Sequence, residues 1–173
     1  MFIKTFGIAF VVAGFGAGGL LRANKMVKRV SQLRKLRWAL SFLEKEMSYN
    51  YTPLSSAMYK TYQFTPAPIN KIFQECSQYL TEKSGVTGNE ALTKALRKVA
   101  PSLELYPEDI DLILASSNQL GMSDIYEQKK LFNLLQENLK IQEEKAQNDL
   151  NSNQKLWSYG GFILGSIIVI LLI

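Results

Sequence analysis

Two apolar segments without charge, one at each end of the chain, constrain the fold most. No Asp, Glu, Lys or Arg occurs in residues 5–21 or in residues 156–173. A helix of about 20 apolar residues spans the hydrocarbon core of a bilayer, and Lys4 can reach back to the headgroups and so lengthen the first segment. We therefore expect transmembrane helices at residues 1–21 and 156–173, with one domain at residues 22–155 between them.

The basic residues are concentrated directly after the first apolar segment. Residues 22–37 contain seven Lys and Arg and no acidic residue, although the formal charge of the whole chain is only +5. Such clusters stay in the cytoplasm, which places the domain inside and both termini outside. A cleaved signal peptide is the alternative for the N-terminus, and it would export the domain. A local cluster beside an apolar segment also argues against a nucleic-acid partner.

The residue types present exclude most catalytic chemistry. The chain has no histidine and one cysteine, which removes disulfide frameworks, the usual zinc sites and every imidazole-dependent triad. Cys76 lies in a helical pattern, and we expect it to be a small buried side chain. We find no phosphate-binding glycine loop and no nucleophile elbow. The sequence thus predicts no enzyme, no cofactor and no metal.

The middle of the chain has the periodicity of helices. No Pro or Gly occurs from residue 22 to residue 52, and apolar residues recur there every three or four positions. This pattern predicts one helix from the first span to about Tyr49. The residues that form its apolar face are Leu33, Leu36, Leu40, Leu43 and Met47.

Shorter helices follow, separated by proline and glycine. Thr52 is the expected N-cap of the next helix, with Pro53 at its first position. Further apolar faces are formed by Ile69, Ile72, Phe73, Cys76 and Leu80, by Leu92, Ala95, Leu96 and Val99, and by Ile110, Ile113 and Leu114. No alternating strand pattern appears. The expected fold is all-α, an antiparallel helical bundle of about six helices flanked by the two transmembrane helices.

The last helix is expected to be long and to pair with the first. Gly121 closes the preceding helix and Ser123 or Asp124 caps the last one. Its apolar face consists of Ile125, Phe132, Leu135 and Leu139. Residues 142–154 are almost wholly polar, so this part needs another partner.

Counting outward from the two spans predicts an antiparallel stalk. In this pairing Lys28 and Arg29 face Asp149, and Arg34 faces Glu143 and Glu144. The alternative for Arg22 and Lys25 is contact with anionic lipid. Glycines four positions apart also suggest close packing of the spans. These glycines are Gly14, Gly18, Gly161 and Gly165.

Two features of the middle allow more than one interpretation. Glu44 and Glu46 do not share a helix face, and ordinary solvated charges explain them. The aromatic segments 49–51 and 59–64 are either a partner surface or tyrosines at the ends of core helices.

One stretch resembles a known family. Residues 33–40 read LRKLRWAL, and residues 43–49 and 52–57 read LEKEMSY and TPLSSA. Together with Leu120-Gly121, Asp124, Gln128 and Lys129, this stretch resembles the stage III sporulation protein AB family. Residues 60–105 match only in being helical.

The resemblance implies a function. That family is similar to the F platform proteins of type II secretion, whose cytoplasmic domains are six-helix bundles beside a secretion ATPase. It differs from them in having one domain copy and two spans in place of two copies and three spans. The expected role is a membrane component of the channel between mother cell and forespore, with its domain in the mother-cell cytoplasm.

The expected partners are other channel membrane proteins, a secretion-type ATPase and the lipid bilayer. The alternative function is a membrane-tethered adaptor or regulator unrelated to secretion. The candidate partner-binding residues are Arg34, Arg37, Glu44, Glu46, Tyr49, Pro53, Leu54 and Asp124.

Overall fold

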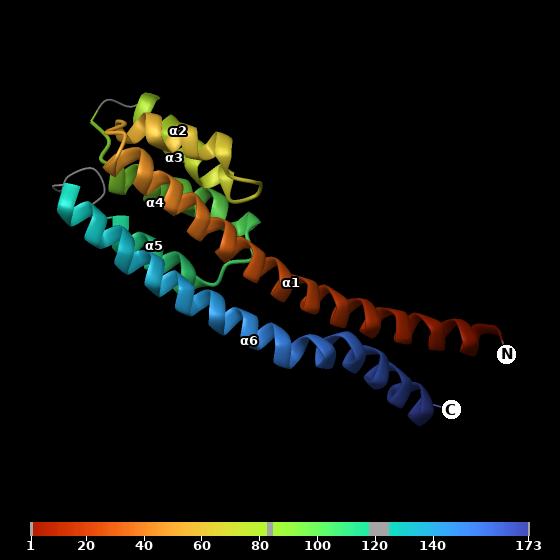
Figure 1. Cartoon of the computed structure of the whole chain (residues 1–173). Coiled ribbons are helices and arrows are strands. Elements are labelled where there is room, and N and C mark those ends of the chain that lie inside the picture. The colour runs from red at the N-terminus through yellow and green to blue at the C-terminus, as the bar shows by residue number, and fades with distance from the viewer. Residues whose placement is uncertain (1, 83–84, 118–124, 173) are drawn as a thin grey trace. The chain divides into compact units, whose positions relative to one another are not determined.

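The chain forms helices throughout the part that the structure describes. The computed structural model describes residues 2–82, 85–117 and 125–172. These ranges contain six α-helices and one short 3₁₀ helix, and no strand (Figure 1). The elements are α1 (Phe2–Ser48), α2 (Leu54–Phe64), α3 (Asn70–Glu82), α4 (Gly88–Val99), η1 (Ala100–Ser102), α5 (Pro107–Ser117) and α6 (Ile125–Leu172). The predicted all-α fold of about six helices is confirmed.

The chain divides into two compact units, and α1 and α6 contribute to both. The first, here called the bundle, is Ser31–Glu144, and the second, the end unit, is Met1–Val30 with Lys145–Ile173. The bundle contains the whole of α2 to α5. The predicted domain limits at residues 22 and 155 follow from the two expected transmembrane helices. The division into compact units does not test where the chain crosses a membrane, so these limits stay predictions.

The core of the bundle is formed by the helix faces that the periodicity predicts. All five residues of the predicted α1 face are buried. In α3 and α4 the buried side chains include Ile72, Phe73 and Cys76, and Leu92, Ala95, Leu96 and Val99, while in α6 they are Phe132, Leu135 and Leu139. Leu80, Ile110 and Leu114 are half-buried. The helix α2 packs on α3, α3 packs on α4, and α4 packs on α5 (Figure 1).

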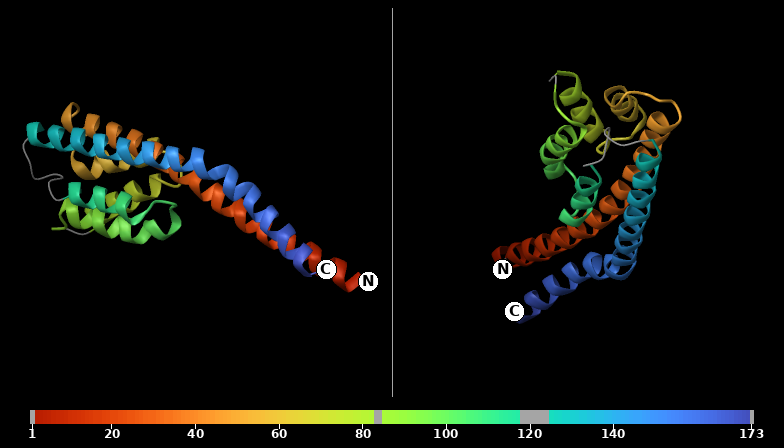
Figure 2. Two further views of the ribbon diagram at one scale, coloured as in Figure 1. Left: turned by 90° about the horizontal axis from the view of Figure 1, so that it is seen from below. Right: turned by 90° about the vertical axis from the view of Figure 1, so that its left-hand side faces the viewer.

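Within the bundle, α1 and α6 run antiparallel. Glu143 contacts Arg34, Gln136 contacts Arg37 and Lys129 contacts Tyr49, so numbers rise along one helix as they fall along the other. The two views of Figure 2 show this part of α6 beside the orange part of α1. The first and last helices of the chain are therefore antiparallel neighbours in the bundle.

The turn from α1 to α2 differs from the prediction at its cap. The N-cap of α2 is Pro53, without a side-chain hydrogen bond, where we expected Thr52. The Thr52 hydroxyl instead donates to Glu46 Oε2 at 2.9 Å, while the Thr52 amide donates to the Glu46 carbonyl at 2.9 Å. Tyr51 takes a left-handed backbone conformation with φ 51°, which lets the chain reverse between the two helices.

Side chains also fix the connections around α4 and α5. Thr87 caps α4 by accepting a hydrogen bond from the Glu90 amide at 3.2 Å. The amide of Glu104, in the segment before α5, donates to Gln32 of α1 at 2.8 Å. That bond attaches the segment between η1 and α5 to the first helix. The predicted caps at Gly121, Ser123 and Asp124 lie outside the described residues.

The end unit consists of residues 2–30 of α1 and residues 145–172 of α6. Ala23 and Val30 are buried in it, as are Ala146 and Leu150. Among the residues that the structure describes, no helix is both long and apolar enough to cross a membrane. The two expected spans have no support from this finding.

The four glycines that we expected to pack the spans lie in the end unit. Gly14 and Gly18 are exposed, with open space where a Cβ would stand. Gly161 and Gly165 lie outside the residues whose side chains are described. Packing through these glycines stays a prediction.

Candidate partner-binding surface

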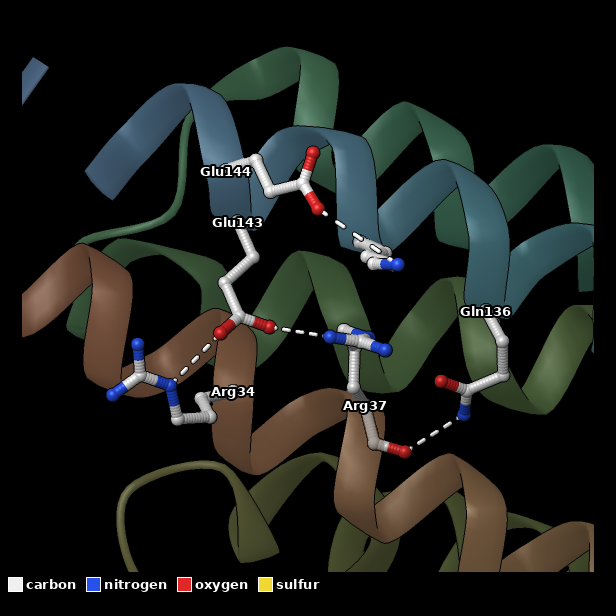
Figure 3. Close-up of polar contacts among 6 residues, drawn as sticks. Arg34, Arg37, Gln136, Glu143 and Glu144 are labelled. Carbon is white, nitrogen blue, oxygen red and sulfur yellow. Dashed lines mark hydrogen bonds and ion pairs between the residues drawn. The ribbon is translucent and has the colours of Figure 1, made fainter. Parts of the chain in front are cut away.

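Arg34 and Arg37 project from one side of α1 and hold a single carboxylate of α6, as Figure 3 shows. Arg34 Nε donates to Glu143 Oε1 at 2.8 Å, and Arg37 Nη1 donates to Oε2 at 2.6 Å. Burial by itself would raise the pKa of the Glu143 carboxyl, but the hydrogen bonds from Arg34 and Arg37 outweigh it and lower the pKa. The carboxylate therefore stays ionised and joins the two helices.

The predicted pairing of the stalk is confirmed at Glu143 but not at Glu144. Glu144 lies one position further around α6 and pairs with Lys140 of its own helix at 3.9 Å. Gln136 adds a second link to α1, because its side-chain amide donates to the Arg37 carbonyl at 2.7 Å. The pairing of Lys28 and Arg29 with Asp149 stays a prediction.

Glu46 has a structural role, which corrects the interpretation of this residue as an ordinary solvated charge. It is buried near the end of α1 and accepts hydrogen bonds from Asn50 at 2.8 Å, Thr52 at 2.9 Å and Lys60 at 2.6 Å. The Lys60 hydrogen bond is the main cause of its lowered pKa, with Thr52 and Asn50 contributing. Glu46 thus fixes the turn and α2 to α1 and is not available to a partner.

Glu44 lies on another side of α1 and is half-buried. Burial raises the pKa of its carboxyl, and the nearby charges of Lys129 and Lys45 oppose that rise. Lys129 of α6 donates to the Tyr49 hydroxyl at 2.9 Å, and its ammonium lies 5.0 Å from the centre of the Tyr49 ring. The end of α1 and the start of α6 are therefore joined through a tyrosine that is itself exposed.

These residues form a surface at the α1–α2 turn, here called the turn surface. Tyr49, Tyr51 and Pro53 are exposed and Leu54 is half-buried. The turn surface consists of Glu44, Tyr49, Tyr51, Pro53, Leu54 and Lys129. Of the predicted partner-binding residues, Glu44, Tyr49, Pro53 and Leu54 lie in the α1–α2 turn or within a few residues of it, whereas Arg34 and Arg37 bind Glu143. Asp124 lies outside the described residues.

An aromatic cluster lies on another exposed side of α1. Its Phe64 belongs to the segment 59–64 that the sequence offered as a partner surface, whereas Trp38 and Phe42 were not predicted to take part. Phe64 of α2 stacks on Trp38 with ring centroids 4.7 Å apart and on Phe42 with centroids 4.6 Å apart. Trp38 is 46% exposed and Phe64 is 53% exposed. A sequence signal existed, because Trp38 does not belong to the apolar face that runs from Leu33 to Met47. A large aromatic residue outside the core face often marks a contact surface.

Cys76 has the environment of an inert core residue, as predicted. It is buried in α3, and burial raises the pKa of its thiol to about 12. The thiolate, which is the reactive form, is therefore scarce at neutral pH. Among the described residues, no group of His, Cys, Asp and Glu side chains could hold a metal ion.

Comparisons with known proteins agree with one another. The family model for stage III sporulation protein AB matches residues 4–173. The chain is 28% identical over 170 residues to stage III sporulation protein AB of Bacillus subtilis (strain 168), covering 98% of this chain and 99% of that protein. A solved structure of stage III sporulation protein AB is similar with a TM-score of 0.67 and 28% identity, covering 71% of this chain and 96% of that chain. The chain therefore belongs to the stage III sporulation protein AB family.

Proposed function

We propose that this chain is a non-enzymatic membrane component of the sporulation channel complex between mother cell and forespore, and that its bundle docks a cytoplasmic ATPase. Membership of the stage III sporulation protein AB family supports the role in sporulation. The proposed partners are the channel's other membrane proteins and a secretion-type ATPase. The proposed location is the cell membrane, with the bundle in the mother-cell cytoplasm.

The observation that carries the docking proposal is the turn surface. Two tyrosines, Tyr49 and Tyr51, are 61% and 72% exposed there, although burying them would remove apolar ring area from water. Tyrosine is enriched at the energetic centres of protein interfaces because it combines a large ring with a hydroxyl. Lys129 supplies a positive charge beside the Tyr49 ring, and the carboxyl of Glu44 interacts electrostatically with Lys129. Charges of both signs help to orient a partner.

Membrane attachment belongs to the same proposal and has a separate support. The described part of α6 in the end unit exposes large apolar side chains on one face, at Ile163, Ile167 and Ile170. These positions are four and three residues apart, so they share a face of the helix. Exposed apolar side chains that share one helix face mark a membrane or protein contact.

The test of ATPase docking uses the full-length chain and the sporulation ATPase of the same organism. We expect the two to bind, and we expect the double substitution Tyr49→Ala with Tyr51→Ala to weaken binding at least ~10-fold without lowering the melting temperature by more than a few degrees. Tyr106→Ala is the matched control, because Tyr106 is also exposed but lies directly before α5, away from the α1–α2 turn in the sequence. Equal binding by the double variant and the wild type would contradict docking at the turn surface.

A further inference from the structure

The aromatic cluster belongs to a regular stripe on α1. Lys35, Trp38, Phe42 and Lys45 follow at spacings of three, four and three residues, which place them on one helix face. Lys45 is exposed. The Lys35 ammonium donates to the Ala67 carbonyl at 3.0 Å, and this neutral acceptor does not neutralise the positive charge of Lys35. This α1 stripe therefore has an aromatic centre, widened by Phe64, and a lysine at each end.

A second stripe with the same spacing lies on α6. Leu134, Glu137, Ile141 and Glu144 again follow at three, four and three residues. Leu134 is 57% exposed and Ile141 is 50% exposed, and both glutamates are exposed. Glu144 has only the 3.9 Å pairing with Lys140, which is weak for two exposed side chains. This α6 stripe is apolar and acidic where the α1 stripe is aromatic and basic.

The two stripes lie at the same level of the bundle but do not face each other. Gln136 and Glu143 are the positions through which α6 contacts α1. Leu134 and Ile141 each precede one of these by two residues, so they point about 200° away around the helix. Trp38 follows Arg37 by one residue and Arg34 by four, so it is turned about 100° from Arg37 and about 40° from Arg34, beside the contact with α6 and not in it. Within one chain, the α1 stripe and the α6 stripe therefore cannot pair with each other.

Other copies of the chain can bind both stripes. We propose that the α1 stripe, with Phe64, binds the α6 stripe of another copy of this chain. If neighbouring copies point the same way, the two stripes meet antiparallel, as α1 and α6 do within the bundle. Trp38 then lies opposite Ile141, Lys35 opposite Glu144, and Lys45 within one turn of Glu137.

This contact is heterologous, because two different surfaces meet. After two copies pair, one copy keeps a free α6 stripe and the other keeps a free α1 stripe, so further copies add until a ring closes or an open array forms. Since the stripes lie at one level of the bundle, successive copies stand side by side with parallel axes. The contact area is small for a protein interface, and we expect association to depend strongly on concentration.

Charge reversal tests the pairing in solution. We expect the full-length variant Lys35→Glu with Lys45→Glu to self-associate at least ~10-fold more weakly than the wild type, because its stripes are then both acidic. The variant Glu137→Lys with Glu144→Lys should be equally impaired. An equimolar mixture of the two variants should associate again, since each supplies the charge that the other lacks. Sedimentation velocity over a concentration series measures all three.

Controls distinguish this contact from other ways of associating. Lys94→Glu reverses an exposed charge on α4 and should leave association unchanged, and circular dichroism checks that every variant is folded. A mixture that stays monomeric would overturn the proposal. So would a wild type that stays monomeric at the concentration it reaches in the membrane.

Crosslinking tests the same pairing without reversing the charge of either stripe. We expect a disulfide between Lys35→Cys in one tagged copy and Glu144→Cys in a differently tagged copy, whereas Lys94→Cys should not crosslink to Glu144→Cys. Cys76 does not interfere, because it is buried. Efficient crosslinking of Lys35→Cys to itself, with none to Glu144→Cys, would show that two α1 stripes meet and would contradict the proposal.

Discussion

Two glutamates only two positions apart show how strongly the environment of a single residue decides its role. Glu46 is buried among three hydrogen-bond donors, and its pKa is lowered. Glu44 lies on another face of the same helix, where burial raises its pKa. The sequence correctly predicts that they do not share a face. It could not predict that Asn50, Thr52 and Lys60 would converge on one of them, because that depends on the reversal of the chain at Tyr51.

Replacing Glu46 should destabilise the bundle. Glu46→Ala removes a carboxylate that accepts three hydrogen bonds, and it leaves Lys60 and Thr52 without this partner. We expect a loss of about 1–3 kcal/mol in the free energy of unfolding, measured by urea denaturation. Glu127→Ala, at an exposed position in the first turn of α6, is the comparison and should cost less. A Glu46→Ala variant as stable as the wild type would contradict the structural role.

The two glutamates should also have opposite effects on the pH dependence of stability. Because the pKa of Glu46 is lowered on folding, its contribution is present above the ordinary value of 4.5 and is lost as the pH falls through the folded-state pKa. Glu46→Gln should therefore lose less stability than the wild type between about pH 5 and pH 3. Parallel thermal melts across this range measure the difference, and identical slopes would contradict it.

Glu44→Gln should act in the other direction. The raised pKa of Glu44 means that ionisation costs stability as the pH rises through its folded-state value. At pH 7 we expect the free energy of unfolding of Glu44→Gln to exceed that of the wild type by less than about 1 kcal/mol. The difference is small because water screens the half-exposed group. The gain should vanish at a pH where the wild-type carboxyl is protonated. A loss of stability at pH 7 would show that the attraction of Lys129 and Lys45 outweighs burial.

Cys76 provides a test of burial at a single atom. With its thiol buried and its pKa raised to about 12, we expect no labelling by a maleimide at pH 7 in the folded chain and complete labelling in denaturant. Mass spectrometry counts the added label. Rapid labelling under native conditions would mean that α3 opens readily or that the thiol is accessible.

At the scale of whole helices, periodicity predicts well the faces that form the core and poorly what lies beside them. The α1 face from Leu33 to Met47 and the α6 face with Phe132 and Leu139 are buried as predicted, because a 3.6-residue period dictates which side chains share a face. The stacking of Phe64 on Trp38 could not be predicted in this way. It depends on how α2 returns along α1, and no local pattern encodes that path.

The contact between α1 and α6 should depend on both arginines. Arg37 is the more buried of the two, with its side chain 30% exposed. We expect Arg37→Ala to lower the free energy of unfolding by about 1–3 kcal/mol, since it also leaves part of the Glu143 charge uncompensated. Arg34→Ala should cost less, because the Arg34 side chain is 62% exposed. Urea denaturation of the two single variants measures the difference, and an equal or reversed order would contradict this ranking.

At the scale of the molecule, the predicted orientation has its own test. Basic residues 22–37 should hold the bundle in the cytoplasm. A reporter that is active only outside the membrane should be inactive when fused within residues 60–110 and active after the C-terminus. Activity within residues 60–110 would contradict the orientation and favour export of the domain, whereas a chain recovered wholly in the soluble fraction would contradict membrane attachment.

The ion pairs of Glu143 also bear on how the chain folds. Arg34 and Arg37 precede Glu143 by 109 and 106 residues, whereas the contacts among α2, α3, α4 and α5 join helices that are consecutive along the chain. Contacts between such distant residues form slowly, because a long loop has to close first. During synthesis, the side of α1 that carries both arginines stays uncovered until α6 has left the ribosome. A chain that stops before residue 143 lacks the carboxylate that both arginines bind, and it exposes that side to other proteins and to proteases.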